Sequence, residues 1–355
     1  MRSIKEVCVA GVGPSSSHTM GPRNACKYIL NKYTNIDQII IVLYGSLAKT
    51  GRGHLTDYII NKTLDSINHK IFFNTVRNVV HPNTMDVFTI TKPYMLHKDR
   101  FISIGGGSLI INDDISSLPK KVYPENNMNE ILSYCSKEKI SLYEYIKKYE
   151  PDAESYYTNI VLLMKNAVER GLSSEELIMP GEYKIHRKAP DMYKNYLSLD
   201  DKDPAKTIEA YMAIAAIAAS EENASGKEVV CSPTCGSSGV IPGIISYLSK
   251  KGYKDEEIVK ALMVGALIGI VCKENGSISG AEAGCQAEIG NAAAIGAATF
   301  AAIDKLSNEQ ITLAAEMVIE HSLGLTCDAI EGRVQIPCIN RNALYAMKAH
   351  DAYVM

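Results

Sequence analysis

The stretch GNAAAIGAATFAAI, residues 290–303, decides how most of this chain folds. Alanine has the highest helix propensity of the amino acids, and its small side chain lets neighbouring helices approach closely. The stretch YMAIAAIAAS, residues 211–220, has the same character. Both segments are therefore expected to be helices in the middle of a tightly packed bundle.

Helix-forming residues with apolar side chains at helical spacing continue on both sides of these segments. The expected helices cover residues 127–148, 155–170, 204–222, 254–273, 286–305 and 308–323. Towards the N-terminus the pattern changes, because β-branched and aromatic runs such as IDQIIIVLYGSLA alternate with helical stretches at 21–32 and 54–68. Such alternation is typical of a small α/β sandwich.

We therefore predict an α+β protein with two domains. The N-terminal α/β sandwich domain comprises residues 1–120, and a larger, mostly α-helical domain comprises residues 124–355. The sequence between them, PKKVYPENN, is rich in Pro, Lys and Asn and has the composition of a linker.

Composition narrows the class of protein. The chain is 46% hydrophobic and 22% charged, which is an ordinary globular balance. A formal net charge of −3 and the lack of a Lys/Arg cluster interleaved with aromatic residues argue against nucleic acid as a partner. The longest apolar helix candidate, IVKALMVGALIGIVC, is shorter than the roughly 20 residues that span a bilayer, and the N-terminal apolar run is too short for a signal peptide. We expect a cytoplasmic protein with no membrane partner.

The nine cysteines suggest thiol chemistry rather than a disulfide framework, because their number is odd and no export signal precedes them. Cys285, Cys327 and Cys338 lie beside Gly, Pro or Asp in segments that we expect to be turns. Cys285 also precedes an Ala-rich helix, whose N-terminus favours a thiolate. The spacing of the three matches no paired zinc motif, so burial as small hydrophobic side chains and metal binding both stay open.

A group of small hydroxyl side chains lies near the N-terminus, in GVGPSSSHTMGP at residues 11–22. Gly-Pro pairs at both ends break regular structure, so Ser15, Ser16, Ser17 and His18 are expected on a loop. A second histidine, His54, lies in the similarly polar GRGHLTD.

Two polar turns interrupt the helical part. The segment CSPTCGSSGVIPG, residues 231–243, has the composition of a backbone nest that receives an anion such as a carboxylate, or of a plain Ser/Thr cap before a helix. The segment KENGSISGAEAGCQAEIG, residues 273–290, again places polar side chains among glycines.

Five segments in order carry a resemblance to a known family: GPSSSHTMGP, GSLAKTGRGHLTD, SPTCGSSGVIPG, SISGAEAGCQAEIG and GLTCDAIEGRVQIPCINRNA. Together they resemble the bacterial iron–sulfur-dependent L-serine dehydratases, also called L-serine ammonia-lyases, in the form that fuses beta and alpha domains in one chain. The resemblance runs from about residue 4 to residue 350. It implies that the chain converts L-serine to pyruvate and ammonia, without pyridoxal phosphate, as a homodimer.

The resemblance also implies roles for individual residues. Cys285, Cys327 and Cys338 would hold a [4Fe–4S] cluster whose fourth iron is open to the substrate. His18 and His54 would be the catalytic acid/base residues. Because His18 lies among three hydroxyl groups suited to binding, we expect His54 to move the proton and His18 mainly to position the substrate. The substrate-binding candidates are Ser15, Ser16, Ser17, Thr19, Pro233, Thr234, Cys235, Gly236, Ser237, Ser238, Lys273, Ser277, Ser279 and Arg341.

Three alternatives stay open at this point. An L-cysteine desulfidase or an L-threonine dehydratase on the same cluster would differ only in leaving group or pocket volume. An amino-acid-binding module without catalytic activity would need no cluster. Two departures from the family pattern concern Cys235, where many members have Asn or Ala, and residues 176–205, which resemble the family least and are interpreted as a trimmed lid or an interface.

Overall fold

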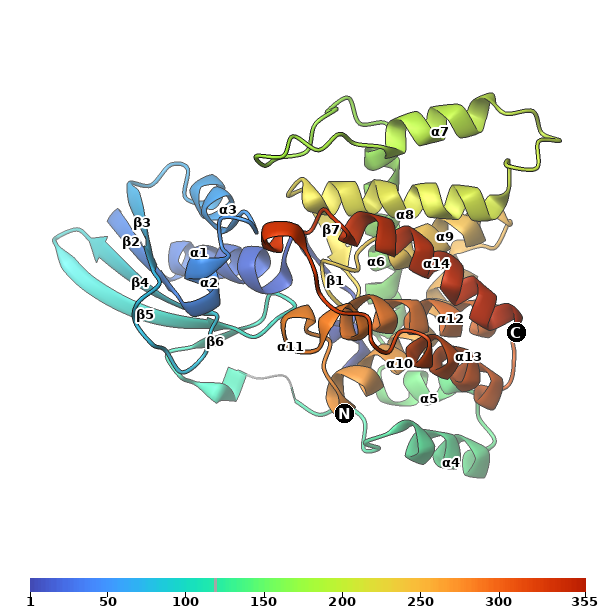
Figure 1. Cartoon of the computed structure of the whole chain (residues 1–355). Helices are drawn as coiled ribbons and strands as arrows, with labels where there is room; N and C mark the ends of the chain where they lie inside the picture. The colour runs from blue at the N-terminus through green and yellow to red at the C-terminus, as the bar shows by residue number, and fades with distance from the viewer. Residues whose placement is uncertain (118–119) are drawn as a thin grey trace.

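The computed structural model describes residues 1–117 and 120–355 and consists of a small sheet-containing part beside a larger helical part (Figure 1). Pro119, the first residue of the predicted linker, lies outside the described residues. The predicted α+β class is confirmed. No helix in the described part of the chain is long and apolar enough to cross a membrane.

The small part is built on a five-stranded mixed sheet with the strand order β3-β2-β4-β5-β6. Its strands are β2 (Ile36–Tyr44), β3 (His69–Asn74), β4 (Thr84–Thr91), β5 (Met95–Ser103) and β6 (Leu109–Ile111). β2 and β3 are parallel, and the other neighbours are antiparallel. The parallel pair is joined by two helices, α2 (Gly45–Lys49) and α3 (Thr56–Thr63).

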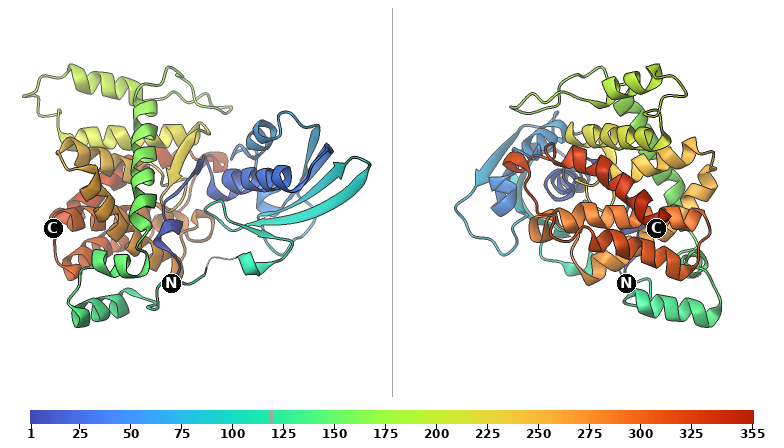
Figure 2. Two further views of the ribbon diagram at one scale, coloured as in Figure 1. Left: turned by 180° about the vertical axis from the view of Figure 1, so that it is seen from behind. Right: turned by 45° about the vertical axis from the view of Figure 1, so that its right-hand side comes forward.

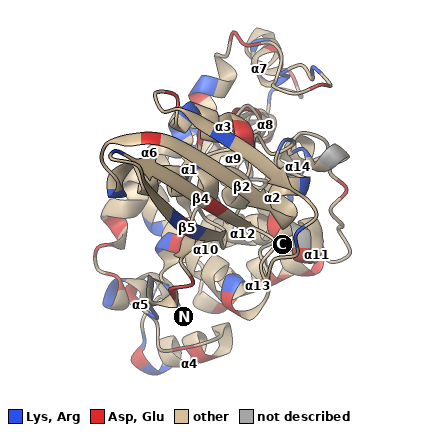
Figure 3. Cartoon of the chain, turned by 90° about the vertical axis from the view of Figure 1, so that its left-hand side faces the viewer, with Lys and Arg blue, Asp and Glu red and all other residues tan. Residues whose placement is uncertain are grey.

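One face of this sheet is covered and the other is not. Ile39, Ile41 and Leu43 alternate along β2 and pack against α1 (Gly21–Lys32), as strand geometry requires of residues that point to one face. α1 and α3 lie between the sheet and the helical part (Figures 1 and 2). The opposite face of the sheet is turned outward (Figure 3). The loops at the N-terminal ends of α1 and α3 therefore face the helical part.

The helical part surrounds α12, the Ala-rich helix Asn291–Ile303, which is almost entirely buried. It packs against helices α10, α13 and α14. A Cβ on Gly265 of α10 would lie 2.5 Å from the backbone oxygen of Ile295, so only glycine permits this helix contact. The helices are α4 (Met128–Glu138), α5 (Leu142–Tyr149), α6 (Ala153–Leu172), α7 (Ala189–Ser198), α8 (Ile208–Ala224), α9 (Val240–Lys250), α10 (Asp255–Asn275), α11 (Gly280–Cys285), α12, α13 (Asn308–Glu320) and α14 (Cys338–Val354).

The first dozen residues pack with the helical part rather than with the sheet. Met1, Ile4 and Val7 are buried in the helical core. The strand β1 (Val9–Val12) pairs antiparallel with β7 (Glu228–Cys231), which directly precedes the turn at 231–243. The chain therefore passes through the helical part before it builds the sheet, and it delivers His18 next to that turn. The division at residues 120 and 124 stays a prediction.

Several predicted elements differ in detail from the structure. The expected helix 127–148 is two helices, because Lys139 adopts a left-handed conformation and Ser141 forms a capping box with Glu144 at the start of α5. The expected Ser/His loop is wrong, since Ser16–Met20 forms a π-helical turn that continues into α1. Cys338 is the first residue of α14 rather than part of a turn.

Candidate active site

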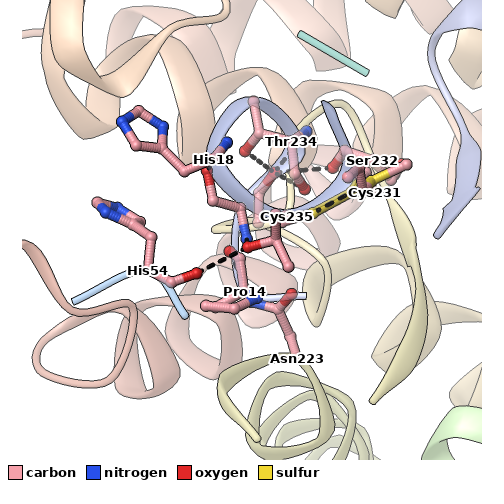
Figure 4. Close-up of a disulfide and its surroundings, with 12 residues drawn as sticks. Pro14, His18, His54, Asn223, Cys231, Ser232, Thr234 and Cys235 are labelled. Carbon is pink, nitrogen blue, oxygen red and sulfur yellow. Dashed lines mark hydrogen bonds between the residues drawn. A yellow bond between two sulfur atoms is a disulfide. The ribbon is translucent and has the colours of Figure 1, made fainter. Parts of the chain in front are cut away.

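Two histidines of the small part lie against each other. The ring centroids of His18 and His54 are 4.6 Å apart, and Figure 4 shows both rings beside the loop that carries Thr234 and Cys235. Thr19 Oγ1 donates a hydrogen bond of 2.8 Å to the backbone oxygen of His54, and Thr56 Oγ1 donates one of 2.6 Å to the backbone oxygen of His18. These bonds fix the two histidine segments to each other.

Both ring nitrogens of His18 are engaged by hydroxyl groups. Nε2 lies 3.1 Å from Thr50 Oγ1 and 2.9 Å from Ser46 Oγ. Thr50 donates its own hydrogen to the Ser46 backbone oxygen, so Thr50 Oγ1 accepts from Nε2–H. Nδ1, 2.8 Å from Ser17 Oγ, is then the acceptor. Ser46 and Thr50 were not among the predicted site residues.

His54 has a different arrangement, which leaves one nitrogen available. Its Nδ1 lies 3.0 Å from the backbone oxygen of Thr50. A carbonyl oxygen only accepts hydrogen bonds, so Nδ1 of the neutral ring carries the hydrogen and Nε2 keeps a free lone pair. No hydrogen bond to Nε2 occurs among the described residues. This nitrogen is therefore arranged as a proton acceptor.

The environment keeps both imidazoles neutral. Burial, with a smaller contribution from the nearby His54, lowers the pKa of His18 to about 3, although a hydrogen bond with Ser46 opposes the shift. Burial also lowers the pKa of His54, against a hydrogen bond to Thr50. At neutral pH neither ring carries a charge.

The serines before His18 are divided between structural and open positions. Ser15 caps the π-helical turn, because its Oγ accepts a hydrogen bond of 3.1 Å from the backbone N–H of His18. Ser16 and Ser17 are partly exposed in the same turn. Ser15 and Thr19 therefore use their hydroxyls within the chain.

Sulfur atoms lie between the π-helical turn Ser16–Met20, here called the histidine turn, and the loop at 231–238. Cys231 and Cys235 form a disulfide, so the expectation of free thiols is wrong for this pair. Met20, at the end of the histidine turn, packs against both sulfurs. Cys235 thus occupies its position in the loop without a free thiol.

The rest of this loop is tightly bonded within the helical part. Ser237 Oγ donates to the backbone oxygen of Ser232 at 2.9 Å, and Pro233, Ser237 and Ser238 are buried. Thr234 Oγ1 donates to the carboxylate of Glu288, to which the backbone N–H of Gly236 also donates. The predicted anion nest is therefore filled by a carboxylate of the chain itself. Glu288 was missed in the sequence, where it is one acid among several.

Asn342 supports the loop from the opposite side. Its Oδ1 accepts from the N–H groups of Gly239 and Val240 at 2.8 and 3.0 Å, and its Nδ2 donates to the backbone oxygens of Gly236 and Cys338 at 2.8 and 2.9 Å. This residue was also missed, because its partners lie about a hundred positions away in the chain.

The polar residues at 273–282 have partners in the protein, some of them outside this segment. Lys273 forms an ion pair with Glu6 at 3.0 Å. Ser277 Oγ donates to Glu282 at 2.7 Å and accepts from the backbone N–H of Ser279 at 3.0 Å. The side chain of Lys273 is therefore directed at the N-terminal segment.

The three predicted ligand cysteines approach one another. Cys285 ends α11 and is buried, Cys327 is exposed, and Cys338 is buried at the start of α14. Burial raises the pKa of Cys285 to about 11, which corrects the expectation of a thiolate favoured by the following helix. Burial also raises the pKa of Cys338, with added repulsion from Glu288 and from the other two cysteines. That repulsion indicates that the three thiols share one region.

Arg341, predicted to bind substrate, points at this cysteine region. Its Nη1 donates to Cys285 Sγ at 3.1 Å and to the backbone oxygen of Thr326 at 3.0 Å, and it pairs with Asp328 at 2.8 Å. Within residues 1–117 and 120–355, no group of three or more His, Cys, Asp or Glu side chains is placed to hold a single metal ion. A cluster binds its cysteines through separate irons, so convergence on one point is not required of it.

Two contacts bring the small part against the cysteine segments. A Cβ built on Gly332, between Cys327 and Cys338, would lie 3.6 Å from Cε1 of His54. The charge of Glu282 in α11 acts on the pKa of His81, which lies on a loop of the small part. His54 is thus the neighbour of the segment that joins two of the candidate ligands.

Residues 176–205 include a loop that packs on the same segment. Gln335 Nε2 donates to the backbone oxygen of Pro180 at 2.8 Å, and Arg333 pairs with Glu182 at 3.6 Å. The loop is anchored by Arg187, which is buried and pairs with Glu222 of α8 at 2.8 Å. Its role as a trimmed lid or an interface stays a prediction.

Known proteins match this chain over nearly its full length. A family model described as the serine dehydratase alpha chain matches residues 109–355, and one described as the serine dehydratase beta chain matches residues 3–68. The chain is 32% identical to L-serine dehydratase 2 of Escherichia coli K12 and 34% identical to an L-serine dehydratase of Helicobacter pylori J99, over 99% of this chain and 89% of each relative. It is also 32% identical to an L-serine dehydratase of Haemophilus influenzae, over 99% of this chain and 90% of that relative.

Proposed function

This chain belongs to the serine dehydratase family, and from that membership we propose that it eliminates water from L-serine to give pyruvate and ammonia. The observation that carries the proposal is the position of His54, whose Cε1 would lie 3.6 Å from a Cβ built on Gly332, between two of the candidate ligand cysteines. Its Nε2 has no hydrogen-bond partner among the described residues. A proton acceptor from one part of the molecule and a thiol-rich segment from the other thus meet at one place.

We propose that Cys285, Cys327 and Cys338 hold a [4Fe–4S] cluster. The repulsion among the three thiols supports this assignment, and so does the hydrogen bond that Arg341 donates to Cys285 Sγ, since such a donor stabilises a thiolate. When bound through three thiolates, a cluster of this kind supplies a Lewis acid at its fourth iron.

The histidines supply the proton chemistry. Neutral His54 can take the Cα proton of the substrate at Nε2, while its Nδ1–H stays bonded to the Thr50 backbone oxygen and holds the ring in orientation. Because burial lowers the pKa of His54, the ring gives that proton up readily to the departing hydroxyl group. His18, with both ring nitrogens hydrogen-bonded, holds the pair of histidines and the turn that carries Ser16 and Ser17 in position.

The polar residues around this place would hold the substrate, and they differ in how free they are. Ser16 lies partly exposed in the π-helical turn and Ser279 directly before α11, and these two are our main candidates for the substrate carboxylate. Ser17 Oγ already donates to His18 Nδ1. Thr234 and Gly236 already bond to Glu288, while Arg341 bonds to the cysteine segment. The homodimer and the cytoplasmic location stay predictions.

Single cysteine substitutions test the proposal. Cys285→Ser, Cys327→Ser and Cys338→Ser, purified anaerobically, should each lose most bound iron and all formation of pyruvate from L-serine. Cys135→Ala is the matched control, because Cys135 is a buried cysteine of α4 with no partner in the site. Full iron content with full activity in any of the three serine variants would exclude that cysteine as a ligand. Kinetics with L-serine, L-threonine and L-cysteine decide which amino acid is preferred.

A further inference from the structure

Glu288 is a partly accessible carboxylate at the candidate site that the proposed proton chemistry does not use. It lies in the π-helical turn Gln286–Gly290, three positions after Cys285. In the described part of the chain no lysine, arginine or histidine pairs with it, and no cation contributes to its pKa. Neighbouring atoms desolvate it and raise its pKa, while Thr234 and Gly236 partly offset this by donating hydrogen bonds.

Two glycines leave room for this carboxylate. A Cβ on Gly236 would lie 2.6 Å from one carboxylate oxygen of Glu288, and a Cβ on Gly280 would lie 2.7 Å from the other. Gly236 belongs to the loop at 231–238 and Gly280 begins α11. The side chain is therefore held between the two polar turns that the sequence singles out.

Two of the candidate ligand cysteines lie near Glu288. Its charge raises the pKa of both Cys285 and Cys338, so it lies within electrostatic reach of two candidate ligands. Ligand cysteines bind as thiolates, which adds further negative charge to this region. A small cation would complement this carboxylate, because a desolvated carboxylate without a positively charged partner is costly even when it accepts hydrogen bonds.

We propose that Glu288 is the counter-ion of the substrate's α-ammonium group and so selects amino acids over hydroxy acids and simple carboxylic acids. The inference rests on the proposed function, which supplies a substrate with an ammonium group. Thr234 Oγ1 and the Gly236 N–H fix one side of the carboxylate, and the other side receives the ammonium. Glu288 is in this sense a specificity-determining residue.

The test compares two ligands that differ only in the ammonium group. L-Alanine and propanoate both lack the leaving hydroxyl, so neither reacts by loss of water, and only L-alanine carries an ammonium. Their affinities for the holoenzyme are measured by anaerobic isothermal titration calorimetry on the parent, Glu288→Gln and Glu282→Gln. Glutamine keeps an acceptor for Thr234 and Gly236 but no charge, and Glu282 is the matched control because it is an exposed acid of the adjoining helix.

We expect Glu288→Gln to bind L-alanine about 10- to 100-fold more weakly, the range of one charge-assisted hydrogen bond, while propanoate binding and iron content stay at the parent level. Its KM for L-serine should rise more than its kcat falls. Any of three results for Glu288→Gln would overturn the inference: equally weakened binding of both ligands, unchanged L-alanine binding, or lost iron. A parent enzyme that does not bind L-alanine would also overturn it. A parent that binds L-alanine but forms no pyruvate from L-serine would overturn the proposed function and leave this assignment standing.

Discussion

Replacing Asn342 by alanine should destabilise the protein more than any other change of an uncharged polar residue in α14. The side chain is 1% exposed and bonds at once to the loop at 231–238, to the first N–H groups of α9 and to the backbone of Cys338. Alanine at this position cannot reach any of these partners. The substitution therefore separates α14, the helix that begins at Cys338, from the loop.

The size of the effect follows from which partners stay unpaired. Val240 N–H keeps a second contact with the Ser237 backbone oxygen at 3.3 Å. The Gly239 N–H and the Gly236 backbone oxygen lose the partner that Asn342 gives them. A buried group left without a hydrogen bond costs about 1–3 kcal/mol, so the two together predict a loss of about 2–6 kcal/mol in the free energy of unfolding.

Urea unfolding of the full chain, followed by far-ultraviolet circular dichroism, measures this loss. Asn340→Ala is the control, because Asn340 is exposed on the same helix and only accepts a bond of 3.2 Å from Lys188. We expect the control to change the free energy of unfolding by less than about 0.5 kcal/mol. An Asn342→Ala variant as stable as the control would refute the view that this residue connects the two segments.

Two further predictions concern the histidines. Asparagine cannot exchange a proton at neutral pH, so the kcat of His54→Asn with L-serine should fall roughly 10²- to 10⁴-fold with unchanged iron content. The kcat of His18→Asn should fall less. Parent-level turnover by His54→Asn would contradict the assignment of His54 as the proton acceptor. The second prediction rests on the lowered pKa of His18, about 3, and on the lowered pKa of His54. Below about pH 6.5 the folded state therefore binds fewer protons than the unfolded state. The stability that the neutral rings contribute is full above about pH 6.5 and is lost as the pH falls towards 3. The acid limb of kcat/KM should accordingly lie below pH 6.5, and a limb centred above that value would contradict it.

The local part of the fold could be predicted from the sequence. The Ala-rich segments gave α8 and α12, because helix propensity and spacing are properties of neighbouring residues. α7 and α14 were missed, since their mixed polar sequences lack such a signal. The pairing of β1 with β7 joins strands more than two hundred residues apart, and nothing in either strand alone specifies its partner.

The candidate site, like the fold, could be predicted from the sequence only where the signal is local. Motifs pointed to the two histidines and the three cysteines, because each lies in a short segment of unusual composition. Glu288 and Asn342 have no such segment, and their importance comes from partners in distant elements. Arg341 stands in a motif, yet its contact with Cys285 Sγ depends on how α14 meets α11.

The most direct test of the account is the iron and acid-labile sulfide content of the chain purified without oxygen, measured together with its rate of pyruvate formation from L-serine. We predict about four irons and about four sulfides per chain, with turnover that rises in proportion to iron content across preparations. Pyruvate formation by iron-free protein, or a fully loaded protein that leaves L-serine unchanged, would contradict the account.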